Sequence, residues 1–154
     1  MVPGETGANV GLKSTPARAP RDERVYSTAP CNTEPDRTTL AVLTTAGLAA
    51  ALTVTGAADT PTIEAFVRPP VVPLRRPGQV LVLDNVATHK GARRRRLVAA
   101  VGCHLRLLST YSPDLSPIGE AFAQRKALLR RAKARTGAAL EAAIGDALNA
   151  VTPR

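Results

Sequence analysis

Apolar positions along the chain predict an alternation of short strands and amphipathic helices. Two apolar runs around a central Ala-Gly pair, Thr38–Leu43 and Leu48–Val54, predict a β-hairpin, although their alanine content leaves a helix as the alternative. The stretch that follows predicts a helix with Asp59 or Thr60 as its cap and Pro61 in its first turn. A hairpin and a helix therefore make up the first half of the pattern.

Two strands and three helices follow in the second half. "QVLVLDN" is a continuous apolar run of the kind found in buried parallel strands, and "CHLRLLS" predicts a further strand. Between them, "KGARRRRLVAAVG" predicts a basic helix that ends at Gly102. A long helix begins after the loop "TYSPDLSP", with Ser116 as N-cap and Pro117 in its first position, and Thr136 caps a final helix. This order predicts an α/β fold with a mixed sheet and helices on its faces.

Residues 1–37 lack this regularity. They are rich in Pro, Gly, Thr and charged residues and predict a loop region, with a short strand near Val25–Tyr26. At 154 residues the chain fits one domain, so we expect residues 1–37 and residues 38–154 to belong to the same unit.

Positive charge is concentrated in one block of the chain. The net charge of +9 divides into 0 for residues 1–89, +10 for residues 90–135 and −1 for the rest. Such a block is typical of a phosphate-binding surface, with a solvated basic surface as the plainer alternative. Aromatic residues make up only 3% of the chain, which argues against a nucleic-acid module that stacks bases.

The cysteines and the hydropathy pattern indicate a cytoplasmic protein. Cys31 and Cys103 are far apart and in no metal-ligand spacing, so we expect two unpaired thiols. No apolar run approaches the roughly 20 residues that span a bilayer, and the first residues do not resemble a signal peptide. We therefore expect no membrane association.

Asp84 is the first candidate for chemistry. "VLVLDNVATHK" places Asp84 and Asn85 at the end of a strand, with His89 five positions beyond Asp84. Ligands of such sheets collect at strand ends, and a carboxylate there can hold Mg²⁺ through oxygen. One acid does not make a two-metal site for phosphodiester cleavage, and capping the next helix is an equal alternative for Asp84. His89 alone favours a surface or hydrogen-bonded histidine over a ligand.

Two blocks of the sequence carry a family resemblance. "VLVLDNVATHKG" and "LLSTYSPDLSPIGEAFAQRKALLRR", with a strand between them, resemble the catalytic core of the DDE transposases, specifically bacterial insertion-sequence enzymes allied to mariner. The resemblance extends over nearly the whole chain and implies an RNase H-like mixed sheet flanked by helices, its first strand truncated within residues 1–37. It also implies transposon-end DNA as partner, homo-oligomerisation with transposase, and three acids that converge on two Mg²⁺ or Mn²⁺ ions.

When the family's three catalytic acids are matched to positions of this sequence, only one of the three positions carries an acid. The second acid falls on Asp84, but the residue after Pro-Ile is Gly119, and the first acid, in a segment aligned with "MVPGETG", is Gly4. The resemblance therefore implies Asp84 as catalytic residue and metal ligand, with Glu120 or Glu5 as stand-ins for the missing acids. A shift of one residue on a helix turns the side chain by about 100°, away from the site.

Basic side chains form the second candidate site, a DNA-binding surface on two predicted helices. Their contacts with phosphates would be independent of base sequence and steeply dependent on salt. The residues are Lys90, Arg93, Arg94, Arg95, Arg96, Arg125, Lys126, Arg130 and Arg131, while Asn85 and His89 support the family motif.

Three hypotheses follow from the sequence. The chain is an active DDE transposase domain, or a catalytically dead RNase H-like domain that holds DNA or a full-length transposase, or a relic that barely folds. Because two of the three acidic positions are glycine, we expect a transposase catalytic-domain fragment that has lost DNA cleavage and strand transfer.

Overall fold

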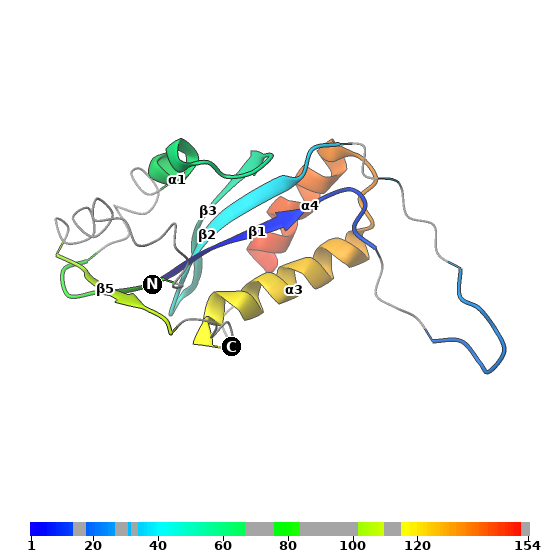
Figure 1. Ribbon diagram of the computed structural model, residues 1–154, viewed down its shortest axis with the longest axis horizontal. Coiled ribbons are helices and arrows are strands. Elements are labelled where there is room, and N and C mark those ends of the chain that lie inside the picture. Colours follow the sequence, from blue (N-terminus) through cyan, green and yellow to red (C-terminus); the bar gives the residue numbers. More distant parts are fainter. Residues whose placement is uncertain are drawn as a thin grey trace.

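Three antiparallel strands organise the fold (Figure 1). β1 (Val2–Ala8) pairs along its whole length with β2 (Arg37–Thr44), and β2 pairs with β3 (Gly47–Thr55). The β2–β3 hairpin confirms the strands predicted from the two apolar runs and excludes the helical alternative. The computed structural model describes residues 1–13, 18–26, 31, 34–66, 76–83, 102–109 and 115–151.

Two shorter strands form a second sheet beside the start of β1. β4 (Val80–Leu83) and β5 (His104–Leu107) pair in parallel, as predicted. The Met1 backbone N donates to the Val80 carbonyl oxygen at 2.8 Å, and the Met1 carbonyl accepts from the Val82 N–H at 2.9 Å. In parallel strands, the N–H and C=O groups of one residue bond to two different residues of the neighbouring strand, as Met1 does here. Met1 thus joins the sheet of β1, β2 and β3 to the sheet of β4 and β5.

One face of the sheet packs against the short helix α1 (Thr60–Phe66). Because successive residues of a strand point to opposite faces, Leu40 and Val42 share one face of β2. Both are buried together with Phe66 of α1, and Ile63 packs against them. α1 therefore covers this face and closes its apolar cluster.

The opposite face is covered by two longer helices, α3 (Pro117–Ala132) and α4 (Gly137–Ala150) (Figure 1). Near the start of α3, Ile118 and Phe122 are buried with Ala41 of β2. Near its end, Leu129 packs with residues of β1, its following loop and α4, namely Ala8, Val10, Leu140, Ile144 and Ala147. The sheet is thus enclosed between helices on both faces, which is the layered arrangement that the sequence predicts.

The residues predicted to cap the helices lie at the helix starts. Asp59 caps α1, because its Oδ1 accepts the Thr62 N–H at 2.9 Å. Hydrogen bonds from Thr62 hold the pKa of Asp59 below its ordinary value. The bond from the Thr62 side chain has the larger effect, and the bond from its backbone has the smaller one. Ser116 is the N-cap of α3, with Pro117 next to it, and Thr136 is the N-cap of α4.

Residues 1–37 differ from the expectation in two respects. Val25 and Tyr26 form no strand: Tyr26 is 87% exposed, in a segment that extends away from the body of the protein (Figure 1). A strand here would need a neighbour to bond with, and none of the described strands pairs with this segment. The first strand, expected to be truncated, has seven residues and a complete set of partners on β2.

Some expectations lie in parts of the chain that the structure does not describe. The predicted basic helix within residues 90–102 falls there, except for Gly102. Cys31 and Cys103 form no disulfide with each other, as predicted: Cys31 is exposed, and Cys103 is buried with its Sγ donating to the Arg76 carbonyl at 3.7 Å. Among the described residues, no helix is long and apolar enough to cross a bilayer.

The two N-caps on this face should differ in strength. The Thr136 hydroxyl accepts the Ala139 N–H at 3.2 Å, whereas Ser116 makes no side-chain cap bond. Thr136→Ala should therefore lower the free energy of unfolding by about 1 kcal/mol, and Ser116→Ala by much less. Urea denaturation of both variants measures this difference. Equal losses would contradict the assigned cap.

Candidate functional site

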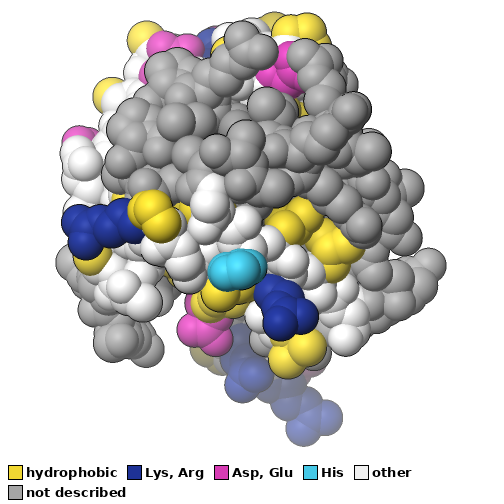
Figure 2. All heavy atoms as spheres, turned by 90° about the vertical axis from the view of Figure 1, so that its left-hand side faces the viewer, with side chains coloured by type: hydrophobic (Ala, Val, Ile, Leu, Met, Phe, Trp, Pro, Cys, Tyr) yellow, Lys and Arg dark blue, Asp and Glu magenta, His cyan; other side chains and the backbone are white. Residues whose placement is uncertain are grey.

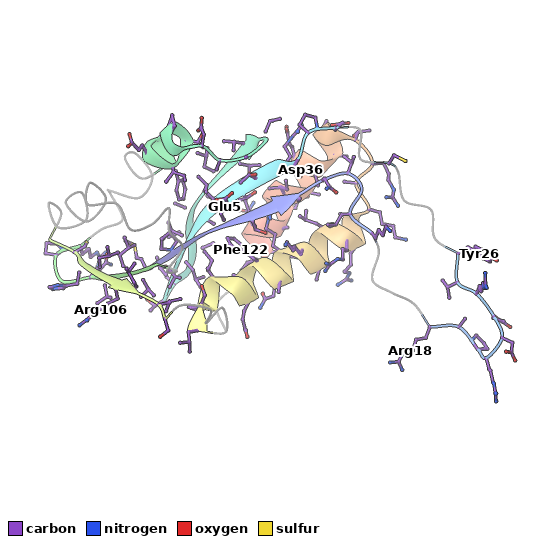
Figure 3. The ribbon with its side chains drawn as sticks, viewed as in Figure 1. Glu5, Arg18, Tyr26, Asp36, Arg106 and Phe122 are labelled. Atoms are coloured by element: carbon purple, nitrogen blue, oxygen red, sulfur yellow. The ribbon has the colours of Figure 1, made fainter. Side chains whose placement is uncertain are left out.

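The start of α3 lies directly on β1. A Cβ atom built on Gly4 would lie 2.9 Å from Ile118 Cγ2 and 3.0 Å from Phe122 Cε2. Figure 3 shows Phe122 between β1 and α3. Position 4 therefore lies against the start of α3, where Ile118 directly precedes Gly119. Gly119 itself is exposed, with nothing within 4 Å of its Cβ position. The family resemblance implies acids at both positions.

The two glutamates beside these positions are both exposed, and their role as stand-ins for the missing acids stays a prediction. Glu5 pairs with Leu40, on the face of the sheet opposite to Gly4 and Ala41, and is exposed. Glu120 is exposed on α3, one residue beyond Gly119. Neither carboxylate is directed into the contact between β1 and α3.

Asp84, Asn85 and His89 lie outside the described residues. Asp84 directly follows the last residue of β4, and β4 is the neighbour of β1. Within the described part of the chain, no three His, Cys, Asp or Glu residues lie close enough to hold a metal ion. Glycine at positions 4 and 119 offers no oxygen ligand from a side chain, so the described residues do not fit a two-metal centre.

The predicted DNA-binding residues are divided by the structure. Lys90 and Arg93–Arg96 lie outside the described residues. On α3, Lys126 and Arg130 are partly exposed and Arg131 is fully exposed, so these three can meet a phosphate. On the β5 side of the molecule, the basic side chains that are drawn lie apart from one another (Figure 2).

Arg125 departs from the expected surface position. It is 0% exposed, and its Nη2 donates to Thr39 Oγ1 at 2.8 Å. Its Nε and Nη1 have no hydrogen-bond partner among the described residues. Burial lowers the pKa of this guanidinium, because desolvation disfavours its charged form. Arg125 therefore belongs to the interior and is removed from the DNA-binding set.

A row of threonines receives this buried side chain. Thr6, Thr39 and Thr53 are paired in register on β1, β2 and β3, and the hydroxyls of Thr39 and Thr53 are 3.0 Å apart. Thr6 and Thr39 are both buried. The row separates the apolar cluster around Ile118 from the cluster around Leu129. The helix thus crosses a polar strip in the middle of its contact with the sheet.

Helical spacing could have identified the burial of Arg125. Ile118, Phe122, Arg125 and Leu129 follow one another at intervals of three and four residues, which places them on one face of a helix. The sequence nevertheless predicts an exposed side chain at position 125, because arginine is almost never fully buried without a partner.

Comparison with known proteins places the fold in a class. The chain resembles a "Mos1 transposase paired-end complex with left transposon end", with a TM-score of 0.74 and 15% identity over 99% of this chain and 48% of that chain. A "Mos1 mariner paired end complex with Mn" gives a TM-score of 0.74 and 13% identity over 99% and 48%. The intasome of simian T-cell lymphotropic virus, in complex with a PP2A regulatory subunit, gives 0.53 and 13% over 93% and 46%. The fold is therefore the RNase H-like fold of the Mos1 catalytic domain.

Sequence comparison supplies the family. Residues 4–141 match the family described as DDE superfamily endonuclease, so the chain belongs to this family. No curated protein sequence matches it. The chain spans about half the length of the solved structures named above.

The buried guanidinium should reduce stability. Arg125 has no carboxylate partner in the described structure, so its desolvation is not offset. We expect Arg125→Met to raise the free energy of unfolding by roughly 1–4 kcal/mol. Urea denaturation measures it, with the exposed Arg131→Met as control, which should change stability by less than about 0.5 kcal/mol. A loss of stability in Arg125→Met would show that the guanidinium is well bonded.

Gly119 should accept a side chain. Nothing lies within 4 Å of a Cβ atom built there, and the residue is the third of α3, following Ser116 by three positions. The carboxylate of a glutamate at this position can accept the Ser116 backbone N–H, which is one half of a capping box. Gly119→Glu should raise the melting temperature by about 2–4 °C, and more than Gly119→Ala does. A decrease, measured by circular dichroism, would contradict the open position.

Proposed function

We propose that the chain is a catalytic-domain portion of a DDE transposase that no longer cleaves DNA or transfers strands. The observation that carries this proposal is that positions 4 and 119, where the family resemblance implies two of the three acids, are both glycine, with Gly4 packed against the start of α3. In a DDE nuclease, acids at these positions would hold two divalent ions, which activate water and stabilise the leaving oxygen. Asp84 alone supplies too few oxygen ligands for that chemistry.

The two neighbouring glutamates support the same conclusion. The side chain of Glu5 leaves β1 on the face that α1 covers, and that of Glu120 is turned by about 100° from position 119 on the helix. Bringing either carboxylate to the seam would require a register shift of β1 or a rewound first turn of α3. Both changes would break the buried contact of Ile118 and Phe122 with Ala41.

DNA binding is the activity that this domain can retain. Lys126, Arg130 and Arg131 lie on the accessible part of α3, and the sequence between residues 90 and 96 adds five more basic residues. Phosphate contacts of this kind need no acid and no metal. The solved complexes of Mos1 with transposon ends support DNA as the partner.

Nicking of supercoiled plasmid in the presence of Mn²⁺ tests the loss of cleavage. The unmodified chain and Asp84→Ala should both leave the plasmid supercoiled, because the metal ligands are incomplete with or without Asp84. Nicking by the unmodified chain that Asp84→Ala abolishes would overturn the proposal. Agarose-gel quantification over several hours gives the rate.

Titration of duplex DNA at several salt concentrations tests the retained binding. Affinity should fall steeply between about 50 and 300 mM salt and should not depend on base sequence. Arg131→Gln and Lys126→Gln should each reduce the salt slope by about one if each contacts a phosphate, while Arg125→Met should leave the slope unchanged. Affinity that does not change with salt would contradict electrostatic binding.

A further inference from the structure

We propose that the free edge of β3 is a docking surface for a second copy of this chain, whose own β3 pairs with it in the antiparallel direction. β3 is the outermost strand of its sheet, because the strand order is β1-β2-β3. Figure 1 shows β3 on the side of β2 that faces away from β1. No other described strand pairs with this edge. The pairing uses neither DNA nor the positions of the missing acids, so it goes beyond the proposed function.

The edge lacks the features that usually keep two sheets apart. Native edge strands are protected by short length, by charged residues or by proline. β3 has nine residues, and its sequence, GLAAALTVT, contains no charged residue and no proline. Its irregularity is the extra residue Ala49, opposite the step from Val42 to Leu43, so the strand pairs regularly from Ala50 onward. In a chain with a net charge of +9, this uncharged strip is a surface on which two copies do not repel each other.

The hydrogen bond that follows β3 shows which of its backbone groups point outward. The Gly56 N–H donates to the Asp36 carbonyl at 2.7 Å, and this pair continues the register of β2 and β3. Antiparallel pairs alternate between hydrogen-bonded and non-hydrogen-bonded, so every second residue of β3 bonds to β2, beginning with Val54. The residues between them turn their N–H and C=O groups toward the free edge: Ala51, Thr53 and Thr55. The described part of the chain offers these groups no partner on that side.

A two-fold axis at Thr53 brings these outward groups together in two copies. Thr53 then lies opposite Thr53 of the second copy, and Ala51 lies opposite its Thr55. Each of these pairs is of the hydrogen-bonded kind and exchanges two N–H···O bonds. An axis at Leu52 would instead place Thr55 opposite the bulged residue Ala49 and lose that pair. The first register is therefore favoured, and it gives the closed two-fold interface that is commonest among identical chains.

The side chains match in the same register. Leu52 packs with the apolar cluster under α1, and Val54 lies on the same face of the strand. Both are partly buried, and Leu52 lies opposite Val54 of the second copy in a non-hydrogen-bonded pair, where side chains approach most closely. On the other face, Thr53 would continue the row of threonines into the second copy. Ala51 and Thr55 are small and exposed, so they do not obstruct the approach.

Charges placed at the two opposed positions test this pairing. Ala51→Lys/Thr55→Lys sets like charges opposite each other and should weaken self-association at least about tenfold. Ala51→Lys/Thr55→Glu is the matched control, because it sets opposite charges across the axis and should associate at least as tightly as the unmodified chain. Both positions are exposed, so both variants should fold, which circular dichroism checks. Sedimentation equilibrium over a series of concentrations, without DNA, gives the dissociation constants.

The sedimentation results decide the proposal in either direction. An unmodified chain that stays monomeric at every concentration would overturn it, whether the edge is bare or another segment of the same chain covers it. A dimer that is equally tight in Ala51→Lys/Thr55→Lys would also overturn it, because a different surface would then hold the copies together. These results do not depend on whether the chain binds or cleaves DNA.

A cysteine at the two-fold axis tests the register and decides the proposal if a charged variant fails to fold. In a Cys31→Ser background, Thr53→Cys should form a disulfide between two copies on mild oxidation. Opposed residues of a hydrogen-bonded pair have Cα atoms about 5.5 Å apart, within the range of a disulfide. Thr55→Cys is the control and should not cross-link, because position 55 lies opposite position 51. Equal cross-linking of the two variants, or none in Thr53→Cys, would contradict the pairing.

Discussion

The close approach of α3 to the backbone of β1 is the constraint on which the rest of the structure depends. Glycine at position 4 lets Ile118 and Phe122 rest on the strand, and this contact buries them with Ala41. Once α3 is fixed in this way, Leu129 reaches the cluster that holds α4. The same contact places Gly4 beside the start of α3, the helix that carries Gly119.

The middle of this contact is chemically unusual for a protein interior. Arg125 lies over a row of threonines on three strands and bonds to Thr39, with two of its nitrogen atoms unbonded within the described residues. A buried charge of this kind disfavours folding unless it is paired. The apolar clusters on either side of Arg125 must therefore offset its desolvation.

Much of the fold could be predicted from the sequence because local signals and periodicity agree. The hairpin, the two parallel strands, and the caps at Asp59, Ser116 and Thr136 all follow from short stretches of sequence. The burial of Arg125 and the close approach of Ile118 to Gly4 could not be predicted in the same way, because both depend on which side chains of α3 face the sheet. The environment of Asp84 stays a prediction, since it lies outside the described residues.

The central claim is that this DDE superfamily domain has too few carboxylates at the seam to hold a catalytic metal pair. Isothermal titration of the unmodified chain with Mn²⁺, beside Asp84→Ala, tests it most directly. Our account predicts weak, non-saturating heats that are the same for both proteins. Saturable binding of two ions by the unmodified chain, lost in Asp84→Ala, would contradict it, because it would show that other acids complete the site.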